Sequence, residues 1–149
     1  MRKKVVVAGE EGVGKTSLMM AVSDAGLSTG GRTVGVDFFV VRSGESTAVI
    51  FDLSGRERFR PLAPSLARGA SLAVLVFDVT RPETLEPLKR WACSLRCRKI
   101  LVANKADSGG LSHEELERAA REVGADRVVV TSVKDGRGLK ELRSAILAS

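Results

Sequence analysis

The chain has 149 residues, of which 44% are hydrophobic and 28% are charged, a composition typical of one globular domain and not of a disordered segment. A formal net charge of +6 with only 4% aromatic residues argues against a nucleic-acid-binding protein, because bases stack on aromatic side chains. The apolar runs are too short to span a bilayer. We therefore expect one domain over residues 1–149 that is cytoplasmic, monomeric and without a nucleic-acid partner.

Short apolar runs alternate with helical patterns along the whole chain. Four continuous runs suit strands that are buried on both faces of a parallel sheet: 5–8, 72–77, 100–103 and 128–130. Two more runs flank Ser43-Gly44-Glu45 and predict a tight hairpin: 36–41 and 47–52. Helices are predicted over 15–24, 82–95, 112–122 and 137–147. The alternation predicts an α/β fold with a mixed, mostly parallel sheet.

The first run leads directly into Gly9-Glu10-Glu11-Gly12-Val13-Gly14-Lys15-Thr16-Ser17. This is the phosphate-loop pattern, and it stands between a strand and a helix, as that pattern requires. Glycines let backbone N–H groups turn toward phosphate oxygens, and the start of the helix adds the positive end of its dipole. Lys15 can reach the β- and γ-phosphates, and the Thr16 hydroxyl can ligate Mg²⁺. The segment predicts a nucleoside triphosphate and leaves the base open.

Two polar segments follow the last two predicted strands: Asn104-Lys105-Ala106-Asp107 and Thr131-Ser132-Val133-Lys134. Open α/β sheets place their ligands at this edge. A carboxylate at Asp107 can accept hydrogen bonds from N1–H and the exocyclic amine of guanine, whereas adenine has no donor at N1. A backbone N–H of the second segment can meet guanine O6. The first segment alone also suits an ordinary turn at the end of a strand, and the two segments together favour guanine.

Asp52-Leu53-Ser54-Gly55 ends the second strand of the hairpin. The Asp52 carboxylate can hold Mg²⁺ through a water, and the Gly55 N–H can meet a γ-phosphate. Thr33 lies upstream in the glycine-rich stretch 26–35. A threonine that ligates Mg²⁺ only when the γ-phosphate is present would order that stretch. Together these residues predict a switch that is controlled by the bound nucleotide.

Taken in order, these motifs resemble those of the small GTPases of the Ras superfamily, and most closely the Rab branch or a prokaryotic protein of that kind. The resemblance covers nearly the whole chain, through GEEGVGKTS, TVGVDF, FDLSGRERF, ARGA, FDVT, NKAD and TSVK. It implies the P-loop NTPase fold, a three-layer sandwich whose six-stranded sheet has one antiparallel strand, with about five helices. It also implies GTP, GDP and Mg²⁺ binding and GTP hydrolysis. Segments 26–36 and 54–68 would then meet effectors, exchange factors and GTPase-activating proteins.

Two positions depart from the pattern of these relatives. Arg56 stands where they usually carry the glutamine that orients the attacking water, and Glu11 stands where they carry glycine or another small residue. Both departures predict weak hydrolysis, with Lys15, Thr33, Gly55 and Arg56 as the catalytic residues. Glu11 and Arg56 would face each other across the γ-phosphate, either as an ion pair or as two solvated side chains. Two alternatives are an Arg56 that acts on the transition state, and a chain that stays bound to GTP as an interaction module.

Other residues have plainer interpretations. No aromatic side chain occurs between Lys15 and Phe38 to cover the guanine, which predicts fast nucleotide exchange. Cys93 and Cys97, four apart in a predicted helix, suit neither a zinc site nor a redox pair, and both are too far from the C-terminus for a lipid anchor. His113, the only histidine, falls in the first turn of a helix with a capping box, which favours a structural role.

Overall fold

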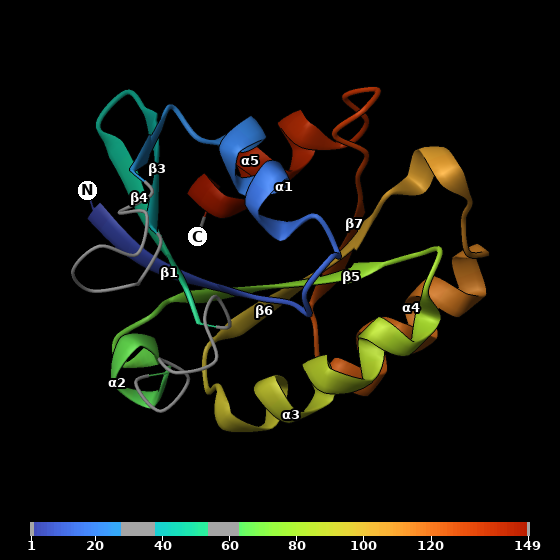
Figure 1. Cartoon of the computed structure of the whole chain (residues 1–149). Coiled ribbons are helices and arrows are strands. Elements are labelled where there is room, and N and C mark those ends of the chain that lie inside the picture. The colour runs from blue at the N-terminus through green and yellow to red at the C-terminus, as the bar shows by residue number, and fades with distance from the viewer. Residues whose placement is uncertain (1, 28–37, 54–62, 149) are drawn as a thin grey trace.

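The computed structural model describes residues 2–27, 38–53 and 63–148. One twisted sheet runs through the molecule, with helices on both of its faces (Figure 1). The strands are β1 (Arg2–Ala8), β2 (Ala25–Leu27), β3 (Phe38–Ser43), β4 (Ser46–Asp52), β5 (Leu72–Asp78), β6 (Arg98–Asn104) and β7 (Arg127–Val130). The α-helices are α1 (Lys15–Val22), α2 (Ala63–Ala67), α3 (Glu86–Ser94), α4 (His113–Val123) and α5 (Leu139–Ala148). Short 3₁₀ helices span Pro82–Leu85 and Ala106–Ser108.

The strand order across the sheet is β2-β3-β4-β1-β5-β6-β7. β1 pairs in parallel with β4 and β5, and the parallel pairing continues through β6 to β7. β3 runs antiparallel to both of its neighbours. The predicted α/β fold is therefore confirmed, with its mixed sheet and its single antiparallel strand. The six predicted strands are present, and β2 adds a short seventh strand at the edge of the sheet.

The hairpin between β3 and β4 has the predicted tight turn. Ser43 pairs with Ser46, so that only Gly44 and Glu45 connect the two strands. Gly44 has a φ of 59°, which is the left-handed region that a two-residue hairpin turn needs and that glycine adopts without steric cost.

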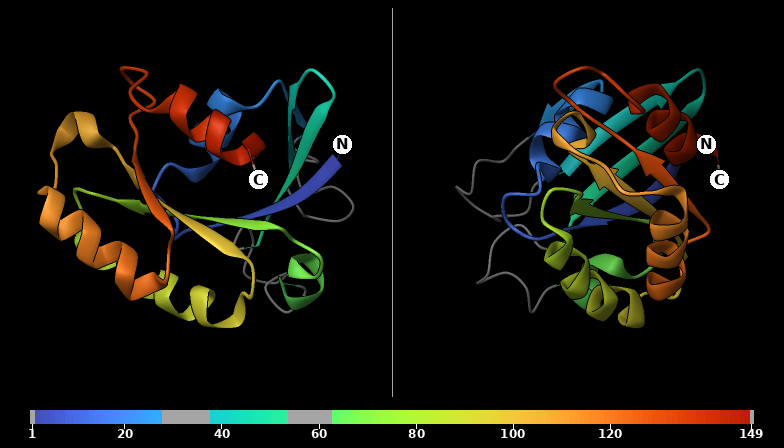
Figure 2. Two further views of the ribbon diagram at one scale, coloured as in Figure 1. Left: turned by 180° about the vertical axis from the view of Figure 1, so that it is seen from behind. Right: turned by 90° about the vertical axis from the view of Figure 1, so that its right-hand side faces the viewer.

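The hydrophobic core lies in two layers, one on each face of the sheet. Val5 and Val7 of β1 pack in the layer beneath α1 and α5, whereas Val6 and Ala8 pack in the layer beneath α3 and α4. The two views of Figure 2 show the same division of the helices between the two faces. Every residue of β5 is buried, because this central strand is covered on both faces. A continuous apolar sequence is what allows this strand to be buried on both faces.

Several predicted boundaries are wrong, for local reasons. The helix predicted over 15–24 ends at Val22, where the Ser23 hydroxyl donates to the Met19 carbonyl at 2.6 Å and the chain then enters β2. The helix predicted over 82–95 begins as a 3₁₀ turn at Pro82, becomes α-helical at Glu86 and ends at Ser94. Of the two cysteines, Cys97 therefore lies beyond the helix.

The last two predicted helices are present with shifted ends. The helix predicted from 137 begins at Leu139, because Arg137 forms a bridge to Ser132. The helix predicted over 112–122 has the expected capping box between Ser112 and Glu115. His113 is exposed in its first turn and lies 2.9 Å from Glu117.

The carboxyl ends of the parallel strands meet at one edge of the sheet. Ala8, Asp52, Asp78, Asn104 and Val130 are the last residues of β1, β4, β5, β6 and β7. This is the edge at which open α/β sheets bind ligands. Within the described ranges, every helix is too short or too polar to cross a membrane.

Candidate functional site

The loop between β1 and α1 is built on glycines that no other residue can replace easily. A Cβ on Gly9 would lie 2.7 Å from the Val76 carbonyl oxygen, and one on Gly14 would lie 2.7 Å from Asn104 Nδ2. Gly12 and Gly14 both have positive φ, 83° and 87°, a region that disfavours other residues. At these glycines the loop presents backbone without side chains, next to the N-terminus of α1, where N–H groups and the helix dipole favour an anion.

A buried ion pair lies directly behind this loop. Lys15 Nζ donates to Asp52 Oδ1 at 2.8 Å, and the two side chains are 9% and 3% exposed. Lys15 also lies 3.4 Å from the Gly9 carbonyl oxygen, so the first residue of α1 is bound to the start of its own loop. Thr16 and Ser17 occupy the exposed side of the same helical turn. The structure therefore places the predicted phosphate ligand Lys15 beside the predicted metal ligand Asp52.

Asn104, at the end of β6, connects the loop before α1 with the segment that follows β7. Its side-chain amide donates to the Val13 carbonyl at 2.9 Å, and its oxygen accepts from the Thr131 hydroxyl at 2.8 Å. Asn104, Val13 and Thr131 are all buried. These bonds hold the phosphate loop against the two segments that follow β6 and β7. Asn104 therefore acts on the loop from within the core, since its own amide atoms are used in these contacts.

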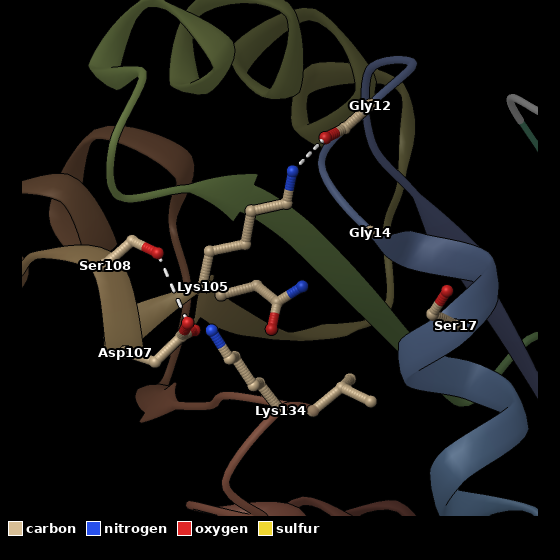
Figure 3. A pocket seen from close by; sticks show the side chains of 9 residues that line it. Gly12, Gly14, Ser17, Lys105, Asp107, Ser108 and Lys134 are labelled. Atoms are coloured by element: carbon tan, nitrogen blue, oxygen red, sulfur yellow. Dashed lines mark hydrogen bonds between the residues drawn. The ribbon is translucent and has the colours of Figure 1, made fainter.

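Lys105 and Asp107 follow Asn104 and diverge from each other (Figure 3). Lys105 adopts a left-handed backbone, with a φ of 65°, and its Nζ donates to the Gly12 carbonyl at 2.6 Å. Asp107 accepts from the Ser132 hydroxyl at 2.9 Å and from the Ser108 hydroxyl at 3.2 Å. The hydrogen bond from Ser132 holds the pKa of Asp107 below its ordinary range. Asp107 is therefore a carboxylate, an acceptor of hydrogen bonds, at neutral pH.

A pocket of about 520 Å³ lies between the loop and these segments. It is lined by Gly12, Gly14, Ser17, Asn104, Lys105, Asp107, Ser108, Val133 and Lys134. All of these except Ser108 are residues that the sequence predicts for nucleotide binding. Gly9, Val13 and Lys15 are buried, Glu10 is half-buried and Glu11 is exposed. Thr33, Gly55 and Arg56 lie outside the described residues, and so does the predicted pairing of Glu11 with Arg56.

The pattern and the geometry at this edge agree with a comparison with known proteins, in which residues 4–148 match the Ras family. The chain belongs to the Ras family of small GTPases. It is 48% identical over 88 residues to the Ras-related protein Rab-7B of Dictyostelium discoideum, an alignment that covers 59% of this chain and 45% of the relative. It is 39% identical over 127 residues to the Ras-related protein Rab-18-B of Danio rerio, with 77% and 60% covered. The matched part is thus about half the length of these relatives.

For this Ras-family chain, sequence reasoning missed three buried polar residues that support the site: Asp78, Thr84 and Thr131. The sequence places Thr131 only in a segment that offers a backbone N–H, yet its hydroxyl fixes Asn104. Asp78 ends β5 and lies 3.4 Å from Lys105 Nζ, and its backbone N–H donates to the Thr84 hydroxyl at 2.9 Å. A carboxylate at the end of an apolar strand, beside the other strand ends, is the signal that could have identified Asp78.

Proposed function

We propose that this Ras-family chain is a guanine-nucleotide-dependent switch that binds GTP and GDP with Mg²⁺ and hydrolyses GTP slowly. One observation carries the proposal. A single pocket has a glycine loop bound to a buried lysine at one end and, at the other end, the Asp107 carboxylate held at 2.9 Å from the Ser132 hydroxyl. The loop end suits a polyphosphate and the Asp107 end suits guanine, and a guanine nucleotide contains both.

The phosphate end would hold its ligand through backbone N–H groups of segment 9–17 and through the Lys15 ammonium. Lys15 is the first residue of α1, where its ammonium adds to the positive end of the helix dipole. In the bound protein, the Gly55 N–H would add a donor for the γ-phosphate. These are the residues that orient the phosphates.

The base end would select guanine. An ionised Asp107 can accept from N1–H and from the exocyclic amine, whereas adenine would leave the carboxylate facing a ring nitrogen that is also an acceptor. The segment Ser132-Val133-Lys134 would supply a backbone N–H to O6. Lys105 and Lys134 line the same end of the pocket, where their aliphatic stems can pack on the faces of the base.

Thr16 and Asp52 would hold Mg²⁺, with Thr33 added when the γ-phosphate is present. No group of three or more His, Cys, Asp or Glu side chains gathers at one place in residues 2–27, 38–53 and 63–148. Mg²⁺ is commonly held by one or two protein oxygens together with phosphate oxygens and waters, and Thr16 and Asp52 would supply such oxygens here. Bound there, Mg²⁺ would offset the negative charge of the phosphates.

Hydrolysis is expected to be weak, because Arg56 has no acceptor with which to orient a water and because the Glu11 carboxylate replaces a small residue. The same two residues favour a second candidate function, a module that stays bound to GTP. In both cases segments 26–36 and 54–68 would be the surface that effector and regulator proteins recognise. The two candidates differ only in what happens to the γ-phosphate.

The test is to remove bound nucleotide from the purified chain, load it with GTP labelled at the γ-phosphate, and follow release of the label with and without Mg²⁺. We expect release slower than about 10⁻⁴ s⁻¹, the intrinsic rate typical of such switches, and faster release in Arg56→Gln. Retained GTP would support the interaction module. Equal affinity for GTP and ATP, or binding of neither, would contradict both candidates.

A further inference from the structure

Two cations hold consecutive carbonyl groups of the phosphate loop. Lys105 Nζ donates to the Gly12 carbonyl at 2.6 Å, and Arg81 Nη2 donates to the Glu11 carbonyl at 3.4 Å. Arg81 comes from the segment after β5, 70 positions away from Glu11 in the sequence. The function proposed above assigns no role to Arg81, although its guanidinium lies against the turn that would face the phosphates.

The position of Arg81 is fixed by a buried carboxylate. Arg81 Nε donates to Asp78 Oδ2 at 3.2 Å, and Asp78 is 1% exposed. The other oxygen, Asp78 Oδ1, accepts from the backbone N–H of Thr80 at 2.8 Å and from its hydroxyl at 2.6 Å. Lys105 Nζ also lies 3.4 Å from Asp78 Oδ2. One anchored carboxylate therefore aims both cations at the loop, which reduces the freedom that a half-exposed arginine would otherwise have.

Arg81 also packs against the turn itself. A Cβ on Gly12 would lie 3.0 Å from Arg81 Nη2, so the guanidinium covers the backbone at the residue whose φ is 83°. This turn carries Glu10 and Glu11, two carboxylates beside the place where a polyphosphate is expected. A fixed cation there would offset part of their negative charge, a role that the sequence offers to Arg56 for Glu11 as one of two alternatives.

We propose that Arg81 is a positioning residue of the phosphate loop: anchored on Asp78, it holds the Glu11–Gly12 turn in place and offsets the charge of Glu10 and Glu11 near the phosphates. The proposal that this raises nucleotide affinity rests on the guanine-nucleotide function above. The hold on the turn does not, because it depends only on contacts within the chain.

The experiment compares Arg81→Ala and Arg81→Lys with Arg98→Ala in the full chain. Arg98 is a matched control, because it forms an exposed ion pair with Asp126 at 3.0 Å at the opposite end of β6. Three quantities are measured: amide hydrogen exchange of segment 9–14, the dissociation rate of a fluorescent GDP analogue, and the affinities for GDP and GMP by competition. Exchange of segment 100–103 in β6 reports general loss of stability.

In Arg81→Ala we expect faster exchange in segment 9–14 with no change in 100–103, and GDP dissociation faster by about tenfold, as for one lost charge-assisted hydrogen bond. GDP affinity should fall while GMP affinity stays within about twofold, because the turn faces the outer phosphates. Arg81→Lys should recover part of the effect, since one ammonium cannot make both guanidinium contacts. Arg98→Ala should leave all three quantities unchanged.

The outcomes separate the two proposals. If the wild-type chain binds no guanine nucleotide but segment 9–14 still loses protection in Arg81→Ala, the proposed function fails and the positioning role stands. If the wild type binds GDP and Arg81→Ala behaves like Arg98→Ala in exchange and in GDP dissociation, the positioning role is wrong. Equal losses of GDP and GMP affinity, together with faster exchange in 100–103, would also overturn it, because they indicate general destabilisation.

Discussion

The two ends of the pocket hold their charged side chains in different ways. At the phosphate-loop end, Lys15 and Asp52 form a buried pair at 2.8 Å. At the other end, Asp107 and Lys134 are exposed, and Asp107 is oriented by hydroxyl groups. A buried charge that loses its partner destabilises the fold, whereas an exposed one returns to water. Residues at the first end should therefore affect both folding and binding, and residues at the second end should affect binding alone.

The largest effect is expected from Lys15→Ala. It removes the proposed phosphate ligand and leaves the Asp52 carboxylate buried without this partner, a change that typically costs about 3–5 kcal/mol of folding free energy. We also expect GDP affinity to fall by about 10³-fold or more, as for the loss of a buried charge pair. Urea unfolding without nucleotide and GDP titration measure the two effects. The matched control is Lys134→Ala at the exposed end, and equal destabilisation by both variants would remove the contrast between the two ends.

Asp107→Asn tests the other end. The substitution keeps the size of the side chain and replaces one acceptor oxygen by a donor group, so we expect GDP affinity to fall by about 10²-fold. The free energy of unfolding should change by less than about 1 kcal/mol, because the side chain is exposed. Xanthosine diphosphate should gain affinity, since xanthine has a carbonyl where guanine has its exocyclic amine. A large loss of stability in this variant would show that the base end is also structural.

The sequence predicts most of the fold and the residues that line the pocket, for a physical reason. The apolar runs 72–77 and 100–103 can be stable only inside a sheet that is covered on both faces, and the glycine loop follows such a run directly. The same reasoning overlooked β2, because three residues that include Gly26 carry no strand pattern. These residues form a strand only because β3 offers them an edge.

The residues that support the site were harder to predict. Asn104 contacts Val13 across 91 positions of the sequence, and Arg81 contacts Glu11 across 70. Such contacts depend on which strands are neighbours in the sheet, and local patterns do not contain that information. The sequence predicts that Asn104 contacts a nucleotide, and its bonds to the loop and to Thr131 are a second role that local patterns do not indicate.

Asn104→Ala is expected to affect both folding and binding by a smaller amount than Lys15→Ala. It leaves the Val13 carbonyl and the Thr131 hydroxyl buried without their partner, which costs about 1–3 kcal/mol. The loop would be less well held, and we expect GDP affinity to fall about tenfold. Thr131→Val is the comparison, because it removes only the second of these bonds and should have about half the effect on stability. If Asn104→Ala lowers GDP affinity without lowering stability, Asn104 acts on binding alone, as we expect for residues at the base end.

The smallest expected effect concerns pH and Asp78. Burial alone would raise the pKa of Asp78, but hydrogen bonds from Thr80 and Arg81, with Lys105 nearby, together hold it below its ordinary value. The stability gained from the carboxylate is therefore present above the pKa of the unfolded chain, about 3.9, and is lost as the pH falls through the lower folded pKa. Asp78→Asn should cost about 1 kcal/mol at pH 7.

The difference in unfolding free energy between the wild type and Asp78→Asn should stay constant from pH 7 to pH 5 and shrink only below about pH 4. Urea unfolding of the two proteins can measure it. Asp126→Asn, at the exposed pair with Arg98, should cost less than about 0.5 kcal/mol at each of these pH values. A difference that grows between pH 7 and pH 5 would mean that the pKa of Asp78 is raised, because the folded wild type would then take up protons and gain stability in this range. In that case Arg81 and Lys105 would not stabilise the charged form of Asp78, and the anchor proposed for Arg81 would lose its support.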